Sequence, residues 1–126
     1  MNGVQKKKVL LVDDQPDIRR LIRLAVGNSY DLLDADTGSV ALDLVRRERP
    51  DLVVLDIMMP GDLDGLDVLD RIRADAELAH TRVLMLTARG QMKDYNVAME
   101  RGADAYLIKP FSPMALADRI ARLLRI

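Results

Sequence analysis

The sequence has no cysteine, one histidine and few aromatic residues, with phenylalanine and tyrosine making up 3% of the chain. The absence of cysteine excludes disulfides, thiolate zinc sites and cysteine nucleophiles, and it is typical of a reducing, intracellular compartment. Long apolar runs are missing too: the basic stretch Lys6 to Lys8 precedes only four apolar residues, Val9 to Val12. A secretory signal needs a longer apolar core, so we expect a cytoplasmic protein that does not enter a membrane.

A strong excess of either charge is also missing. The chain has a formal net charge of -1, and 31% of its residues are charged while 49% are apolar. Such a balance provides no broad basic surface for nucleic acid or for an anionic membrane, so we expect no direct nucleic-acid binding. A length of 126 residues fits one domain with one core, and we predict a single domain over residues 1–126.

Continuous apolar runs predict the strands of the sheet. Val9 to Val12, Leu52 to Leu55 and Val83 to Leu86 are uninterrupted, which is typical of central parallel strands covered on both faces. The segments Tyr30 to Asp36 and Ala105 to Ile108 are shorter or interrupted by acids, so we expect them at the sheet edges.

Between these runs, apolar residues recur at spacings of three and four, which indicates amphipathic helices. The fourth such segment is the weakest, because only Tyr95, Ala98 and Met99 share an apolar face before Gly102, a residue typical of a helix C-terminus. Strands and helices therefore alternate as five βα units, which predicts an α/β fold with a doubly wound parallel sheet and right-handed crossovers. The helical positions are Ile18, Leu21, Ile22 and Ala25; Ala41, Leu44 and Val45; Leu66, Leu69 and Ile72; Leu116, Ile120 and Leu123.

Polar residues stand where four of the predicted strands end. They are Asp13 and Asp14, Asp56, Thr87 and Lys109. Each has an ordinary explanation alone, since Asp14 and Thr87 could cap helices, Asp56 could open a turn and Lys109 could be a solvated loop cation. Ligands of such sheets bind outside the carboxyl ends of the strands, where all five residues should meet. We therefore predict a functional site there.

The charges of this cluster indicate its chemistry. Three carboxylates and one lysine leave a net charge of about -2, and two like charges 4 Å apart repel by about 4 kcal/mol at an effective dielectric constant of 20. Oxygen ligands without histidine or cysteine favour Mg²⁺, with Mn²⁺ as the alternative. A metal beside a lysine and a hydroxyl is typical of phosphoryl transfer, in which Asp56 attacks phosphorus, Thr87 donates to an oxygen and Lys109 neutralises charge.

Five segments resemble the receiver domain of two-component response regulators, over roughly residues 8–124. They are LLVDD (residues 10–14), LVVLDIMMPG (52–61), Asp64-Gly65, LTARG (86–90) and GADAYLIKPF (102–111). The resemblance implies a flavodoxin-like sheet of order 2-1-3-4-5 with five helices. It implies that Asp56 accepts a phosphoryl group from a sensor histidine kinase or a histidine phosphotransfer protein, and that the domain catalyses only its own phosphorylation and dephosphorylation.

The resemblance also implies a ligand set. Asp14, Asp56 and the backbone carbonyl of Met58 would bind Mg²⁺ directly, and Asp13 would act through water. The Lys109-Pro110 peptide bond would be cis. This ligand set would explain why a buried strand ends in two acids, because a metal and its waters would satisfy their charge at the open edge of the sheet.

A switch is implied as well. Thr87 would move toward the phosphoryl group, vacate space beside Ala88 and let Tyr106 turn inward, which changes the face formed by the fourth helix, the fifth strand and the fifth helix. Phosphorylation would promote a homodimer there. Charged contacts for it could come from Arg119, Arg122, Asp104 and Lys93, each of which is otherwise an ordinary solvated charge.

Met58 and Arg89, two residues beyond Asp56 and Thr87, would cover the approach of the hydrolytic water. An apolar thioether and a permanently protonated guanidinium cannot orient that water as a base, so we expect slow autodephosphorylation. The loop after Pro60 departs from the family by one extra residue among Gly61, Asp62 and Leu63, which reshapes it.

Three other functions are compatible with parts of the sequence. A phosphohydrolase using Asp56 would typically have a second acid where Met58 stands. A nucleotide- or flavin-binding module would have a GxGxxG or GxxxxGK[ST] loop after the first strand, and none is present. A structural receiver that is never phosphorylated would normally lack one of the five site residues. The chain is either a stand-alone receiver or the receiver of a longer regulator.

Overall fold

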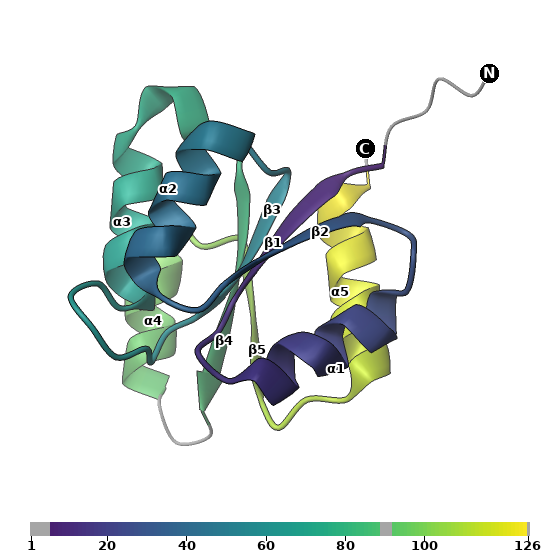
Figure 1. Ribbon diagram of the computed structural model, residues 1–126. Helices are drawn as coiled ribbons and strands as arrows, with labels where there is room; N and C mark the ends of the chain where they lie inside the picture. Colours follow the sequence, from purple (N-terminus) through teal and green to yellow (C-terminus); the bar gives the residue numbers. More distant parts are fainter. Residues whose placement is uncertain (1–5, 89–91, 126) are drawn as a thin grey trace.

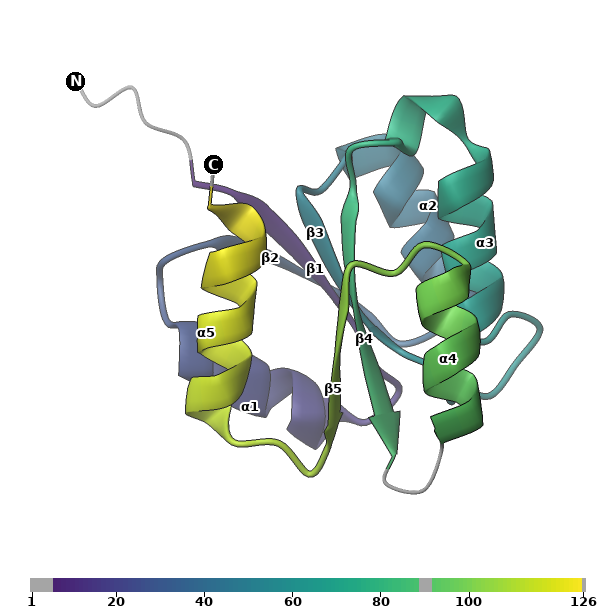
Figure 2. The same cartoon turned by 180° about the vertical axis from the view of Figure 1, so that it is seen from behind.

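The structure, a computed structural model, describes residues 6–88 and 92–125, and the side chains of residues 92–94 are not described. Five parallel strands form one sheet of order β2-β1-β3-β4-β5. Helices cover both of its faces, with α1 and α5 on one side and α2, α3 and α4 on the other (Figures 1 and 2). The predicted α/β architecture is confirmed.

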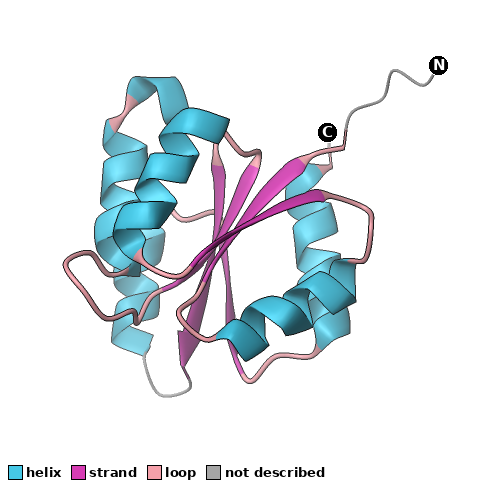
Figure 3. Cartoon of the chain, viewed as in Figure 1, coloured by secondary structure: helices cyan, strands magenta, loops and turns pink. Residues whose placement is uncertain are grey.

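The strands begin and end close to the predicted positions. They are β1 (Lys8–Val12), β2 (Asp31–Ala35), β3 (Leu52–Asp56), β4 (Arg82–Ala88) and β5 (Ala105–Lys109). The continuous apolar runs form the three central strands, and the two segments with acids or little length form the edges, as predicted. All strands point the same way, so their carboxyl ends lie at one edge of the sheet (Figure 3).

The helices are α1 (Pro16–Val26), α2 (Gly38–Glu48), α3 (Gly65–Ala74), α4 (Met92–Glu100) and α5 (Pro113–Leu124), with a short 3₁₀ turn, η1 (Ala76–Leu78). Their starts follow local chemistry. Thr37 accepts a hydrogen bond from the Val40 amide at α2, Asp64 and Asp67 form a capping box at α3, and Ser112 caps α5.

Two apolar clusters hold the helices on the sheet. Val9, Leu11, Val54 and Leu86 project toward α1 and α5, where they pack with Ile22, Val26, Leu116 and Ile120. The alternate residues of the same strands project toward the opposite helices, where they pack with Ala41, Val45, Val68, Leu69, Ile72 and Ala98. This double burial explains why the central strands are apolar without alternation. No helix within the described residues has the length and apolar character needed to cross a membrane.

Candidate functional site at the carboxyl edge of the sheet

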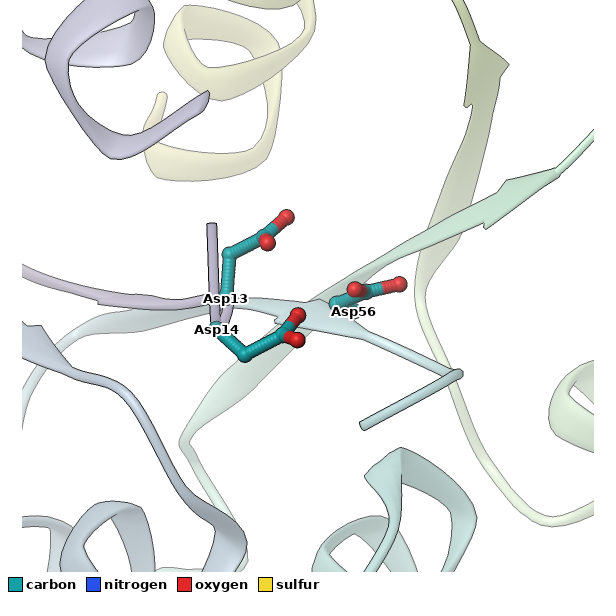
Figure 4. A group of neighbouring side chains, drawn as sticks. All are labelled: Asp13, Asp14 and Asp56. Carbon is teal, nitrogen blue, oxygen red and sulfur yellow. The ribbon is translucent and has the colours of Figure 1, made fainter. Parts of the chain in front are cut away.

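The three predicted acids lie together at the ends of β1 and β3. One carboxylate oxygen from each of Asp13, Asp14 and Asp56 lies within 4.8 Å of the others (Figure 4). Their environments differ, because Asp13 is 1% exposed and Asp56 is 5% exposed, whereas Asp14 is an exposed residue. Adjacent residues at a strand end project in opposite directions, which separates the first two acids.

Asp13 is held at all of its polar groups. Its amide donates to the Ala35 carbonyl at 3.2 Å. Its Oδ1 accepts from the Gln15 amide at 2.9 Å, and its Oδ2 accepts from Lys109 Nζ at 2.9 Å. Its backbone carbonyl accepts from Arg19 Nη1 at 2.6 Å. Asp13 therefore serves as a fixed point of the site.

Asp56 is the last residue of β3 and faces Lys109 across the sheet edge. Its Oδ2 lies 3.2 Å from Lys109 Nζ, and its Oδ1 accepts from the Met58 amide at 3.3 Å. Burial, followed by the negative charge of Asp13, raises the pKa of the Asp56 carboxyl from 3.8 to about 6, although Lys109 and the Met58 amide act in the opposite direction. Lys109 therefore neutralises the negative charge of Asp56 only in part.

Lys109 joins the two buried acids from the end of β5. Burial alone would lower the pKa of its ammonium group, but the hydrogen bond to Asp13 and the charges of Asp56 and Asp13 outweigh burial and leave the pKa above its usual value. The ammonium is therefore charged at neutral pH. The Lys109-Pro110 bond is cis, as predicted.

Glycines allow the backbone to close tightly around the acids. A side chain at Gly65, the first residue of α3, would place a Cβ 2.2 Å from the Asp56 backbone oxygen. A Cβ at Gly38 would lie 2.4 Å from the Leu63 oxygen, so the reshaped loop rests against the start of α2. Gly61, in this loop, has φ of 103°, a conformation that glycine adopts without strain.

Thr87 provides a buried hydroxyl near the end of β4. The residue is 2% exposed, and its Oγ1 has no hydrogen-bond partner among the described residues. A buried hydroxyl without a partner costs about 1–3 kcal/mol, so this donor is ready for an acceptor that enters the site. Ala88, the next residue and the last of β4, is exposed and pairs in register with Lys109.

Tyr106, the predicted switch aromatic, is half-buried on β5. Its ring lies 4.0 Å from that of Tyr95 on α4, measured between centroids and with an interplanar angle of 53°. Its backbone carbonyl accepts from Arg119 Nη1 at 3.1 Å. Tyr106 therefore contacts both neighbouring helices of the predicted switch face, one through its ring and one through its backbone.

Met58 is 57% exposed just after β3, while Arg89 lies outside the described residues. Three of the four ordinary explanations do not hold: the N-cap of α1 is Gln15 rather than Asp14, Thr87 lies within β4, and Lys109 ends β5 in two ion pairs. The fourth holds in part, because Asp56 accepts a hydrogen bond from the Met58 amide in the turn that follows β3. His80 is exposed, as expected for a loop residue.

The Arg19 contact and the two close approaches at Gly38 and Gly65 were not predicted from the sequence. The Arg19 contact joins residues six positions apart through the turn between β1 and α1, and no periodic pattern marks it. The Asp64-Gly65 pair did indicate a turn, but the contact of Gly65 with the backbone of Asp56 depends on the path of the whole loop.

The arrangement suits a divalent cation and a phosphoryl group. Within the described residues, three carboxylates lie near one ammonium group, that of Lys109. Asp14 is exposed, so its carboxylate can turn toward an ion. Oxygen-only ligands fit Mg²⁺ or Mn²⁺. The Lys109 ammonium and the Thr87 hydroxyl, which no other described residue contacts by a hydrogen bond, are both donors, as the oxygens of a phosphoryl group require.

Comparison with known proteins agrees with this chemistry. The family model described as "response regulator receiver domain" matches residues 9–121. The chain is 39% identical to a DNA-binding response regulator, MtrA, of Mycolicibacterium smegmatis over 121 residues, which are 95% of this chain and 51% of MtrA. It is 40% identical over 120 residues to the alkaline phosphatase synthesis transcriptional regulatory protein PhoP of Bacillus subtilis, covering 94% of this chain and 49% of PhoP. The chain thus spans about half the length of these curated relatives.

Solved structures extend the likeness to the whole fold. A putative response regulator from Chloroflexus aurantiacus has a TM-score of 0.89 and 31% identity, covering 95% of this chain and 98% of that one. The chemotaxis response regulator CheY4 of Vibrio cholerae has a TM-score of 0.87 and 29% identity, covering 95% of this chain and all of CheY4. The chain therefore belongs to the response regulator receiver domain family and is a phosphoacceptor signalling domain of two-component systems.

Proposed function

We propose that Asp56 is the residue of this chain that accepts the phosphoryl group. The observation that carries the proposal is the pairing of Asp56 with Lys109, together with a buried Thr87 hydroxyl that has no hydrogen-bond partner within the described residues. An Asp56 oxygen forms the new bond to phosphorus as the bond between phosphorus and the donor histidine nitrogen breaks, which gives an acyl phosphate. Lys109 then neutralises the phosphoryl oxygens and Thr87 donates a hydrogen bond to one of them.

Asp14, Asp56 and the Met58 carbonyl would hold Mg²⁺ directly, with Asp13 acting through water. When bound, the ion neutralises charge on the acids and on the phosphoryl oxygens. The different exposures of Asp13 and Asp14 support this assignment. Both carboxylate oxygens of Asp13 already accept hydrogen bonds, whereas Asp14 is exposed.

The phosphodonor would be a sensor histidine kinase or a histidine phosphotransfer protein. An apolar groove borders Lys109 and offers a contact surface for such a donor, next to the atoms that react. It is lined by Gln15, Ile18, Leu21, Lys109, Pro110 and Phe111. Its walls come from the start of α1 and from the segment between β5 and α5, so a partner seated there reaches the carboxyl edge of the sheet.

Phosphorylation would switch the face formed by α4, β5 and α5, and a homodimer would form through it. Internal contacts already occupy three of the charged groups considered for this dimer. Asp104 pairs with Arg73 at 2.9 Å, Arg122 pairs with Asp118 at 3.0 Å, and Arg119 donates to the Tyr106 carbonyl. Dimer contacts at these positions would have to exchange with internal ones. Lys93 falls among the side chains that the structure does not describe.

Apart from its own phosphorylation and dephosphorylation the domain would catalyse nothing. Met58 stands where a hydrolase would have a second acid, and neither it nor Arg89 can act as a base for water. The acyl phosphate would therefore be long-lived, which suits a sustained output.

Intact-protein mass spectrometry tests the proposal. The parent chain, incubated with acetyl phosphate and Mg²⁺, should gain the mass of one phosphoryl group, and it should gain none when the ion is chelated. Asp56→Asn should abolish the uptake, while Asp62→Asn, an exposed change in the neighbouring loop, should label like the parent. Labelling of Asp56→Asn at the parent's level would refute the assignment.

A further inference from the structure

In the described part of the chain, the side chain of Arg19 makes one hydrogen bond to the acid cluster, and the acceptor is a backbone carbonyl. Its Nη1 donates to the carbonyl oxygen of Asp13 at 2.6 Å, and Arg19 is a half-buried residue. Asp13 is the first residue after β1, and the last pair in register between β1 and β2 is Val12 with Ala35. The side chain of Arg19 thus supplies the hydrogen bond that a continuing strand would otherwise supply, in the short form typical of a charged donor.

This hydrogen bond orients the peptide that joins Asp13 to Asp14. The Asp13 amide and both of its carboxylate oxygens are held by other groups, so the carbonyl bond fixes the remaining polar atom of that residue. A peptide unit is planar, and the direction of its carbonyl also sets where the next Cα lies. Arg19 therefore sets the position from which the Asp14 side chain starts.

Asp14 depends on such support more than the other two acids do. Its carboxylate is exposed, and no hydrogen bond from the described residues holds it, whereas Asp13 and Asp56 both pair with Lys109. The backbone beneath Asp14 is therefore what directs its carboxylate toward Asp56, as seen in Figure 4.

We propose that Arg19 is a positioning residue of the metal site, which acts on Asp14 through the Asp13 carbonyl. The inference rests on the proposed function, because it takes Asp14 as a direct Mg²⁺ ligand. Groups that orient metal ligands without touching the metal commonly contribute tenfold or more to affinity. Arg19 is one such group, located on α1 rather than on the strands that deliver the ligands.

The charge of Arg19 and its hydrogen bond predict opposite changes in Mg²⁺ affinity when the residue is replaced. Removing a cation beside an acidic cluster should strengthen the binding of a dication, because less positive charge then opposes it. Removing the hydrogen bond should weaken binding, because Asp14 then samples orientations that do not face Asp56. The sign of the change in affinity therefore separates positioning from electrostatics.

The test compares three variants of this 126-residue chain with the parent in a Mg²⁺ titration followed by amide NMR shifts. Arg19→Gln removes the charge and shortens the donor, Arg19→Lys keeps a charged donor, and Arg20→Gln is the matched control. Arg20 is exposed on the same helix, so its replacement changes net charge equally without touching the Asp13 carbonyl. We expect Arg19→Gln to bind Mg²⁺ about tenfold more weakly. Arg19→Lys should recover part of the loss, and Arg20→Gln should match the parent.

Two further measurements separate a positioning role from a purely structural one. Without metal, the amide signals of Asp14 and Gln15 should shift in Arg19→Gln more than signals elsewhere on α1. Urea unfolding shows whether the variant stays folded, and affinity is read from folded-state signals only.

Unchanged or tighter Mg²⁺ binding by Arg19→Gln would overturn the inference, as would equal weakening in Arg20→Gln. A parent chain that binds no Mg²⁺ would instead overturn the proposed metal site, and this inference with it.

Discussion

Replacing Asp56 by asparagine should stabilise the metal-free protein, and the gain should increase with pH. The Asp56 carboxyl has a pKa of about 6 in the folded chain, against 3.8 as its ordinary value, because it is buried beside Asp13. The folded state therefore binds this proton more tightly than the unfolded state does. As pH rises from about 4 to about 6, ionisation increasingly favours the unfolded chain, so the parent loses stability across that window.

The size of the effect follows from the shift. About two pKa units correspond to about 3 kcal/mol, which is an upper value because the site is open to solvent on one side. Part of this loss of stability is already present in the parent at pH 4.5, because the carboxyl is mostly ionised in the unfolded chain at that pH. The advantage of Asp56→Asn over the parent should therefore grow by about 1–2 kcal/mol between pH 4.5 and pH 7.5.

Urea unfolding in the presence of a chelator, followed by far-ultraviolet circular dichroism, measures this difference. Asp43→Asn, an exposed change on α2, is the control and should stay within about 0.5 kcal/mol of the parent at both pH values. Adding Mg²⁺ at pH 7.5 should stabilise the parent more than Asp56→Asn and so narrow the gap. An advantage that stays constant or shrinks between pH 4.5 and 7.5 would refute the idea that burial of the Asp56 charge costs stability.

Three other predictions follow from the site. Asp14→Ala should weaken Mg²⁺ binding more than Asp13→Ala, because Asp14 is the exposed acid; calorimetric titration compares them, and parent-like affinity in both variants would rule out the metal site. Thr87→Val should leave the free energy of unfolding within about 1 kcal/mol of the parent, since no described residue is a partner of its Oγ1, and should abolish the change in tyrosine emission on adding beryllofluoride. The chain has three tyrosines and no tryptophan, so Tyr30→Phe should keep that response and Tyr106→Phe should lose it. Met58→Asn combined with Arg89→Glu should speed first-order loss of the phosphoryl group at saturating Mg²⁺, and decay at the parent's rate would show that these residues do not set the lifetime.

The positions of the site residues could be predicted because they depend on regular features of the chain. Apolar runs such as Val9 to Val12 mark strands, and parallel strands bring their carboxyl ends to one edge. The resemblance to receiver domains then supplied the strand order and the cis bond before Pro110, both of which the structure confirms. Local sequence rules and the fold agree here because a strand's end and a helix's start are separated by only a few residues.

The environments of those residues could not be predicted in the same way. Asp13 and Asp14 are identical and adjacent, yet one is 1% exposed and the other is open to solvent, because the chain turns into α1 directly after them. The Arg19 contact depends on the angle at which α1 leaves the sheet, and the fit of Leu63 against Gly38 depends on how a lengthened loop closes. Each is set by tertiary packing, which periodicity does not encode.

Several polar groups of the metal-free site are incompletely satisfied. On the proposed function, Mg²⁺ and a phosphoryl group would satisfy all of them. Lys109 neutralises the buried charge of Asp56 only in part. Among the described residues, the Thr87 hydroxyl has no acceptor and the Asp14 carboxylate has no partner. The buried Thr87 hydroxyl, which has no partner among the described residues, costs about 1–3 kcal/mol, and the buried charge of Asp56, whose pKa is raised to about 6, costs up to about 3 kcal/mol. Satisfying both groups would therefore release several kilocalories. A difference of that size would be enough to shift a two-state element such as the proposed switch of Thr87 and Tyr106. On the proposed function, these unsatisfied polar groups of the metal-free site would supply the free energy that drives the switch.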